Sequence, residues 1–287
     1  EWDRLAGDDN PFMSHAFLAA MEDSGSVGPG SGWQAAPITV ADQAGTMHAA
    51  LPAYLKMHSQ GEYVFDQGWA DAYQRAGGRY YPKLQIAAPF TPATGPRLLL
   101  EDEAFAAPLL RAAEQVCHEH GLSGAHATFI APEQVPLFED AGWLMRSDLQ
   151  FHWENRDYAD FDAFLDTLES RKRKNLRKER AKAQEAVEIR HLTGADLTEE
   201  VWDAFWEFYQ DTGMRKWGTP YLTREAFTLL GERMGEKILL IFAYIDGQPV
   251  AGAMNVIGGT TLFGRYWGCL ADIPFLHFEL CYYQAID

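Results

Sequence analysis

The most constraining feature of this sequence is a series of apolar segments separated by turn dipeptides near its C-terminal end. Ile238–Ile245 is followed by Asp246-Gly247, and Val250–Ile257 is followed by Gly258-Gly259. Both dipeptides are typical of two-residue hairpin turns, because their residues accept positive φ angles. The pattern therefore predicts an antiparallel meander whose third strand is Thr260–Tyr266.

Helices and further strands are predicted along the rest of the chain from apolar periodicity and from cap and turn residues. Ser14 is expected to cap the first helix, and Gly121 to end the second. The predicted helices are 12–21, 103–120, 132–140, 161–186, 199–213, 223–235 and one from about 278, and the predicted strands are 36–40, 47–57, 126–130, 143–153 and 187–191.

A weak internal repeat connects the two halves of the chain. Residues 38–50 and 242–253 each read as strand, acidic turn and strand, with helices before them. Any two hairpins look alike, but the preceding helices favour two copies of one α/β unit. We therefore expect domains at 1–153 and 154–287, with the long basic helix in the second. The last helix is cut off at Asp287, so we expect the natural chain to continue.

Composition narrows the class of protein. Hydrophobic residues make up 47% of the 287 residues, enough for a large core, and no apolar run approaches the ~20 residues that span a bilayer. The acidic start does not resemble a signal peptide, and the three cysteines are too scattered for a disulfide framework. The net charge of −17 argues against general attraction to nucleic acid or to an anionic membrane, and no DNA partner is predicted. These features indicate a cytoplasmic protein.

The positive charge is nevertheless concentrated in one segment. Eight of the 24 basic residues lie in the 12 positions 171–182. One helix face is expected to carry Arg171, Lys174, Lys178 and Lys182, and a neighbouring stripe carries Arg173, Arg177 and Arg180.

This basic helix has two interpretations. It is either a solvated charged face or a binding site for phosphates, a nucleotide pyrophosphate or an RNA backbone. Its lack of interleaved acids, which surface helices use for i,i+4 pairs, favours the binding site.

Two further groups of residues are candidates for binding. Tyr80, Tyr81 and Lys83 place phenols beside a cation in an irregular segment, which is equally consistent with a buried aromatic cluster edged by cations. Arg97 follows a proline-rich loop and could bind a carboxylate or phosphate, although a surface ion pair is slightly favoured.

Candidates for catalysis (Tyr266, His277 and Glu279) and one for substrate binding (Trp267) lie at the end of the meander. Tyr266, Trp267, His277 and Glu279 fall where a duplicated α/β fold would place a cleft. His277 or Glu279 could accept a proton from an amine nucleophile, and His277 is also an ordinary helix-start residue. Cys117, His118 and His120 have poor spacing for zinc, so no metal site is predicted.

Several segments together resemble a known family, the FemAB-like predicted N-acyltransferases, which are related to the Fem peptidoglycan aminoacyltransferases. In the basic segment, Arg173-Lys174-Asn175 followed by Arg177 and Lys178 is similar to the basic helix of the Fem enzymes. The other matching segments are 58–66, 78–84, 89–97, 264–269 and 277–279.

The resemblance implies a tandem pair of acetyltransferase-like (GNAT-like) α/β domains and transfer of an acyl or aminoacyl group to an amine. One motif is missing. Acetyltransferases carry an Arg/Gln-x-x-Gly-x-Gly/Ala loop that binds the pyrophosphate of coenzyme A, and residues 74–79 and 265–270 are only near misses. Acyl-CoA and aminoacyl-tRNA both remain open as the donor, and no tightly bound cofactor is expected.

The sequence thus favours a cytoplasmic acyltransferase that acts on a small-molecule or peptide amine. The rival hypothesis is a non-catalytic protein that recognises a polyanion or a peptidoglycan precursor through the basic helix. The donor, the acceptor and the oligomeric state are left open.

Overall fold

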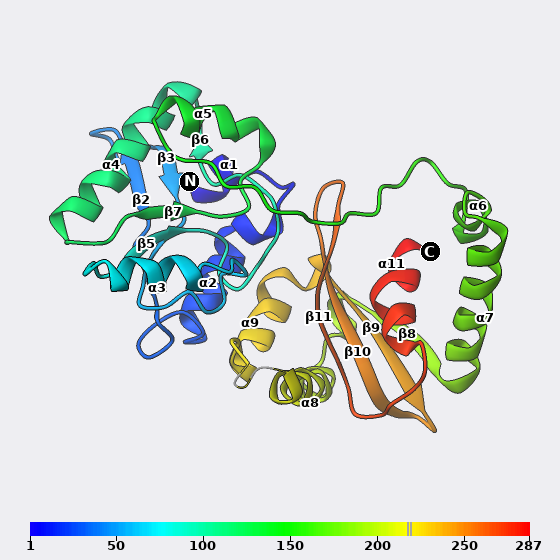
Figure 1. The fold of residues 1–287 in the computed structure, drawn as a ribbon. Helices are drawn as coiled ribbons and strands as arrows, with labels where there is room; N and C mark the ends of the chain where they lie inside the picture. The colour runs from blue at the N-terminus through cyan, green and yellow to red at the C-terminus, as the bar shows by residue number, and fades with distance from the viewer. Residues whose placement is uncertain (217, 219) are drawn as a thin grey trace. The chain divides into compact units, whose positions relative to one another are not determined.

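The computed structural model describes residues 1–216, 218 and 220–287, and the chain divides into two compact units (Figure 1). Unit 1 comprises Glu1–Arg146 and Tyr221–Arg233, and unit 2 comprises Ser147–Pro220 and Met234–Asp287. The segment 221–233 thus belongs to unit 1, although the chain before and after it belongs to unit 2.

Before the connection to unit 2, unit 1 contains five α-helices and seven strands. Its principal helices are α2 (His15–Asp23), α3 (Gln67–Arg75) and α4 (Ala106–Glu119), with the shorter α1 (Trp2–Ala6) and α5 (Val135–Asp140). Its strands are β1 (Trp33–Ala35), β2 (Ile38–Ala41), β3 (Met47–Leu51), β4 (Ala53–Lys56), β5 (Lys83–Ile86), β6 (Leu99–Leu100) and β7 (Ala125–Ala127).

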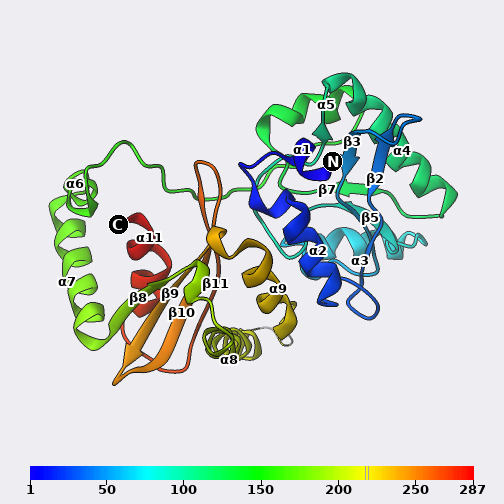
Figure 2. The same ribbon diagram turned by 180° about the vertical axis from the view of Figure 1, so that it is seen from behind.

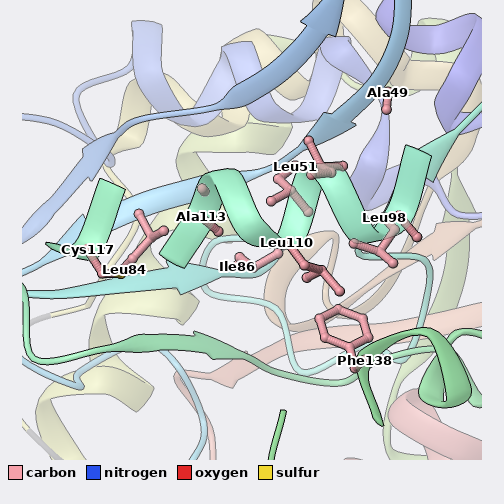
Figure 3. Close-up of a cluster of buried hydrophobic side chains, with 12 residues drawn as sticks. Ala49, Leu51, Leu84, Ile86, Leu98, Leu110, Ala113, Cys117 and Phe138 are labelled. Atoms are coloured by element: carbon pink, nitrogen blue, oxygen red, sulfur yellow. The ribbon is translucent and has the colours of Figure 1, made fainter. Parts of the chain in front are cut away.

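The strands of unit 1 form two small sheets, ordered β1-β4-β5-β7 and β2-β3-β6. Side chains alternate along a strand, so Leu84 and Ile86 of β5 point to the same face. There they pack with Leu110 and Ala113 of α4 and with Phe138 of α5 (Figure 3). This apolar core fixes α4 across one face of the sheets.

Helix α9 (Arg224–Met234) is tied to unit 1 by polar contacts. The Thr223 amide donates to Ser26 Oγ at 3.1 Å, and the Thr223 hydroxyl donates to the Ser24 carbonyl. Arg233 forms an ion pair with Asp23 of α2 at 2.7 Å.

Unit 2 is built on one antiparallel sheet in the order β11-β10-β9-β8 (Figure 2). Its strands are β8 (Glu188–Leu192), β9 (Ile238–Ile245), β10 (Gln248–Ile257) and β11 (Leu262–Cys269). Its helices are α6 (Phe161–Asp166), α7 (Ser170–Ala186), α8 (Glu199–Lys216), α10 (Leu276–Phe278) and α11 (Gln284–Ile286), with a π-helical segment, Glu279–Tyr283, between the last two.

Both faces of this sheet are covered by helices, because successive side chains of β9 point to opposite faces and pack on different helices. Phe242 packs on Phe205 and Phe208 of α8. The neighbours of Phe242 on the strand, Ile241 and Ala243, point to the opposite face and form a core with the C-terminal helical segment. The meander predicted from the sequence is confirmed, as is the mixed α/β class.

The two turns of the meander agree only in part with the turns predicted from the sequence. Asp246 and Gly247 have φ angles of 50° and 78°, as a two-residue hairpin with positive φ requires. The second turn is longer than predicted. It spans residues 258–261, with the Gly258 amide donating to the Thr261 carbonyl, so β11 begins at Leu262.

Three predicted elements are wrong. The strand predicted over 47–57 is interrupted at Pro52, and its two parts belong to different sheets, β3 beside β2 and β6, and β4 beside β1 and β5. Residues 143–153 form no strand, and Leu149 and Phe151 are exposed, because the alternating pattern has no neighbouring strand to pair with. The helix predicted over 161–186 is broken into α6 and α7. At the break, the Thr167 hydroxyl donates to the Phe164 carbonyl, and the Leu168 amide reaches back only three residues.

The tandem duplication and the boundary after residue 153 stay predictions. Unit 1 contains the parallel pair β5–β7, whereas every strand pair of the unit 2 sheet is antiparallel. Among the described helices, none combines the length and apolar composition needed to cross a bilayer.

Candidate functional site

The outer face of α7 carries a stripe of cations. Arg171, Lys174, Lys178 and Lys182 are all exposed, at the spacing that places them on one side of the helix. In the part of the chain that the structure describes, none of these four has a carboxylate within ion-pair distance. We call these four residues the α7 cationic stripe.

The neighbouring arginines of α7 are paired instead. Arg173 Nη1 lies 3.4 Å from Asp166 Oδ1, and Arg177 Nη2 lies 2.9 Å from Asp162 Oδ1. Both acids belong to α6, which the break at residues 167–169 brings alongside α7. The sequence drew attention to the lack of interleaved acids within α7, but the structure supplies acids to these two arginines from α6. Asn175, between them, is exposed.

Arg180 connects α7 to the C-terminal end of the described chain. Its guanidinium lies 3.2 Å from Glu279 Oε1, also pairs with Asp287, and sits over the Phe161 ring. Glu279 Oε1 accepts further hydrogen bonds from the side-chain amides of Gln184 and Gln284. Glu279 is fully buried, and its second oxygen has no hydrogen-bond partner among the described atoms.

A pocket of about 340 Å³ opens beside this network, between α6 and α7. It is lined by Asp160, Phe161, Asp162, Leu165, Arg177, Arg180, Ala181, Gln184 and Asp287. Its walls thus combine guanidinium groups, carboxylates and one aromatic ring.

The candidates at the end of the meander separate into two places. Tyr266 packs on Tyr209 of α8, with ring centroids 5.1 Å apart. Trp267, the next residue of β11, points to the other face and contacts the ring of His277 at 5.1 Å. His277 is exposed, whereas Glu279 is buried two residues later. Trp267 and His277 therefore share one location, and Tyr266 lies on the far side of the sheet.

In unit 1, the second face of the β1-β4-β5-β7 sheet is polar. Lys56 of β4 lies directly opposite Lys83 of β5 in the antiparallel register, and Gln85 lies opposite His126 of β7. Both lysines are fully buried. Two like charges side by side in the interior are unfavourable unless acids neutralise them.

Glu62 and Asp66 provide that neutralisation. Lys83 Nζ lies 2.7 Å from Glu62 Oε2 and 2.8 Å from Asp66 Oδ2. Lys56 Nζ lies 3.8 Å from Glu62 Oε1, donates to the Gln60 carbonyl, and sits 3.6 Å from the centroid of the Trp33 ring.

The phenols singled out from the sequence complete this cluster. The Tyr80 hydroxyl donates to Asp66 Oδ2 at 2.9 Å, and the Tyr81 hydroxyl lies 2.7 Å from Ser59 Oγ. Ser59 in turn donates to Asp66 and accepts from Lys83. We call Lys56, Ser59, Glu62, Asp66, Tyr80, Tyr81 and Lys83 the buried charge cluster.

Burial and pairing shift the pKa values within this cluster in different directions. Burial lowers the pKa of Lys56 to about 7, although Glu62 acts in the opposite sense. Burial raises the pKa of Glu62. Burial would also raise the pKa of Asp66, but the hydrogen bonds from Lys83, Ser59 and Tyr80 outweigh it, and that pKa is lowered.

Arg97 lies apart from this cluster and is fully buried. Its guanidinium donates to the main-chain carbonyls of Thr128, Ala93 and Pro96, at 2.7, 2.7 and 3.1 Å. The surface ion pair favoured from the sequence is therefore wrong. The side chain fixes the proline-rich loop to the segment after β7.

The acidic half of the buried charge cluster was not singled out from the sequence. Glu62 and Asp66 lie in the segment 58–66, one of the segments that carry the family resemblance. The sequence signal that could have indicated these two acids is their position in an irregular stretch rich in aromatic residues. Among the described residues, no group of His, Cys, Asp or Glu side chains is arranged to hold a metal ion.

The fold has counterparts among solved structures. The C-terminal domain of a protein described as a lysylphosphatidylglycerol synthetase, from Agrobacterium fabrum, superposes with a TM-score of 0.54 at 12% identity, covering 99% of this chain and 70% of that one. The L-PGS of Bacillus licheniformis gives a TM-score of 0.48 at 10% identity, covering 96% and 73%. The mixed α/β architecture is therefore shared with the Agrobacterium fabrum domain.

The sequence comparison is more specific. The model of the FemAB-like family, described by peptidoglycan biosynthesis/recognition, matches residues 1–287, and the chain belongs to this family. The resemblance stated from the sequence is thus confirmed. No curated protein matches the sequence closely enough to be counted as a relative.

Proposed function

We propose that this protein is an N-acyltransferase, which moves an aminoacyl or acyl group from a polyanionic donor to an amine. The observation that carries the proposal is the FemAB-like match along the whole chain. The fold shared with a lysylphosphatidylglycerol synthetase domain supports it, because that protein's name describes attachment of a lysyl group.

The α7 cationic stripe supports a donor that carries several phosphates. Its side chains are exposed, without carboxylates within ion-pair distance among the described residues, and regularly spaced along a helix. Cations in this arrangement suit a phosphate backbone or a pyrophosphate. Aminoacyl-tRNA and acyl-CoA are the two donors that fit this chemistry, and the acceptor is a small-molecule or peptide amine, such as a cell-wall precursor.

The reaction itself needs little specialised chemistry. The amine attacks the carbonyl carbon of the donor, a C–N bond forms, and the C–O bond of a tRNA ester or the C–S bond of a thioester breaks. The tRNA hydroxyl or the thiol leaves, and the ammonium proton passes to a base or to water. Positioning of the two substrates supplies much of the rate in such reactions.

The catalytic candidates take different roles in this proposal. His277 is exposed beside Trp267, so its imidazole is accessible to an amine. Glu279 is buried and accepts hydrogen bonds from α7, which fits a residue that positions α7. Tyr266 lies on the other face of the sheet and is the weakest of the three.

The experiment is a transfer assay with each donor class. Purified protein is incubated with tRNA charged with labelled amino acids, or with labelled acyl-CoA, together with a UDP-linked muropeptide that bears a free amine. We expect label to move to the muropeptide from one donor class. If a donor binds and raises the melting temperature but no label moves under any combination, the rival function, recognition without turnover, is favoured.

A further inference from the structure

An unusual group of aromatic side chains lies exposed on unit 1. Phe65 is 86% exposed, Trp69 67% and Tyr73 47%. Trp69 and Tyr73 are four residues apart in α3 and share one face of the helix, and Phe65 directly precedes its first turn. Ala70 is the buried residue of α3. A surface on which large aromatic side chains are exposed together is typical of an interaction site. We call these three residues the α3 aromatic stripe.

The buried charge cluster holds this stripe in place. Asp66, at the start of α3, does not cap the helix with its side chain but bonds to Lys83, Ser59 and Tyr80. Lys83 and Asp66 thereby fix the first turn of the helix to the sheet. A buried ion network is costly to form, so its use to position an exposed aromatic face needs a functional reason.

The C-terminal end of α3 is fixed by close packing. A Cβ atom added at Gly78 would lie 2.4 Å from the Tyr73 ring, so the chain passes directly against that ring. The Tyr73 ring also meets Tyr80 edge to face, with centroids 6.3 Å apart. The Tyr73 end of the stripe is therefore held in place by packing.

Three arginines lie at the two ends of the stripe: Arg75 in the last turn of α3, Arg79 shortly after the helix, and Arg146 beside Phe65. Arg75 and Arg79 are exposed, and within the described part of the chain neither has a carboxylate within 4.0 Å. Arg146 donates to the Phe65 carbonyl at 3.5 Å. The protein has 41 acidic and 24 basic residues, so arginines left without acids are notable here. Asp71 is the acid within α3, and it accepts a hydrogen bond from Gln67.

We propose that the α3 aromatic stripe docks the protein on an anionic lipid bilayer. Tryptophan, tyrosine and phenylalanine rings are favoured at the boundary between headgroups and acyl chains, and basic residues beside them contact lipid phosphates. The net charge of −17 does not prevent this, because charges more than about 10 Å away are largely screened at 0.1 M salt.

The geometry suits a lipid surface better than nucleic acid. One helical turn separates Trp69 from Tyr73, about 6 Å along the axis, whereas successive bases stack about 3.4 Å apart. Rings side by side on a convex helix enter a soft interface together, but they do not form a groove that follows a strand.

The test is co-sedimentation of the chain with vesicles of phosphatidylcholine, with and without phosphatidylserine. We expect binding to the mixed vesicles, weakened by added salt. The double variant Phe65→Ala, Trp69→Ala should lose binding at least ten-fold. The variant Arg75→Gln, Arg79→Gln should lose about five-fold per arginine on the mixed vesicles and little on phosphatidylcholine alone.

Phe151→Ala is the matched control, because Phe151 is 90% exposed outside the stripe and should leave binding unchanged. Circular dichroism of each variant confirms that it is folded. The proposal is overturned if the chain does not bind the mixed vesicles, or if Phe151→Ala weakens binding as much as the stripe variant. It is also overturned if single-stranded RNA binds through these rings instead, or if the stripe variant breaks up a dimer in vesicle-free solution. The vesicle test measures binding and involves no acyl transfer, so its result is independent of the transfer assay.

Discussion

At the scale of single residues, the clearest feature is the pair of buried lysines opposite each other on β4 and β5. The sequence drew attention to Tyr80, Tyr81 and Lys83 through their density of phenols and cations. It could not show that Lys83 pairs with Glu62 and Asp66, which lie about 20 residues earlier, because that depends on how the segment 57–82, with α3 inside it, folds over the sheet.

Replacing Asp66 with Asn tests the strength of this cluster. The substitution removes a charge that pairs with a fully buried ammonium, and leaves Lys83 with Glu62 as its other acid. We expect the free energy of unfolding to fall by about 3 kcal/mol in denaturant titrations. Asp71→Asn, on the exposed side of α3, should change it by less than about 0.5 kcal/mol. Equal effects of the two substitutions would contradict a structural role for the cluster.

The pKa of Lys56 predicts how stability depends on pH. Burial lowers this pKa from 10.5 to about 7 in the folded protein, so the unfolded chain binds more protons between these values. The contribution of Lys56 to the free energy of unfolding therefore rises with pH across that window. We expect wild type to gain stability relative to Lys56→Met from about pH 7 to pH 10. A difference that is constant over this range would show that Lys56 titrates normally.

At the scale of elements, the break between α6 and α7 decides which cations are available for a ligand. A continuous helix would place residues 15 apart about 22 Å from each other, yet Arg177 and Asp162 are in contact at 2.9 Å. The sequence indicated the amphipathic periodicity of the whole segment correctly, and Phe161, Leu165 and Leu176 do pack together. It gave no strong stop signal at Thr167, so the acids of α6 were not foreseen as partners of α7.

Binding of polyanions should distinguish the two faces of α7. In the variant Arg171→Gln, Lys174→Gln, Lys178→Gln, we expect affinity for the donor to fall at least ten-fold without loss of stability, since no ion pair is broken. The matched variant Arg173→Gln, Arg177→Gln loses exposed ion pairs worth up to about 1 kcal/mol each, and should bind nearly as wild type.

The salt dependence of the same measurement identifies the donor class. The logarithm of the affinity falls with the logarithm of the salt concentration, with a slope of about −0.7 for each phosphate of a single strand that the protein neutralises. A steep slope therefore indicates tRNA as the donor, and a shallow slope indicates coenzyme A. If the stripe variant binds every polyanion as wild type does, the stripe is a solvated face and takes no part in donor binding.

At the scale of the whole molecule, the sequence predicted the mixed α/β class and the meander, because hairpin turns and strand periodicity are local signals. The return of Tyr221–Arg233 to unit 1 is not local. It depends on contacts such as the stacking of Phe90 on Tyr221, with ring centroids 5.5 Å apart, which join residues more than a hundred positions apart. No periodicity in either segment indicates that contact.

This return predicts the behaviour of a fragment. Residues 1–153, the first domain expected from the sequence, lack the segment that bonds to Ser24, Ser26 and Asp23. We expect the fragment to melt at a lower temperature than the full chain, and a peptide of residues 220–234 to restore part of the loss. A fragment as stable as the full chain, with no response to the peptide, would show that the segment contributes nothing to unit 1.

The central claim is that the protein transfers an acyl group from a donor held by α7, and one kinetic comparison tests it directly. Transfer to the muropeptide amine is measured for wild type and for Arg171→Gln, Lys174→Gln, Lys178→Gln over a range of donor concentrations. We predict transfer by wild type, and in the variant a KM for the donor raised at least ten-fold with kcat little changed, because the stripe binds the donor away from the reacting atoms. Absence of transfer by wild type, or identical kinetics in the two proteins, would contradict the claim.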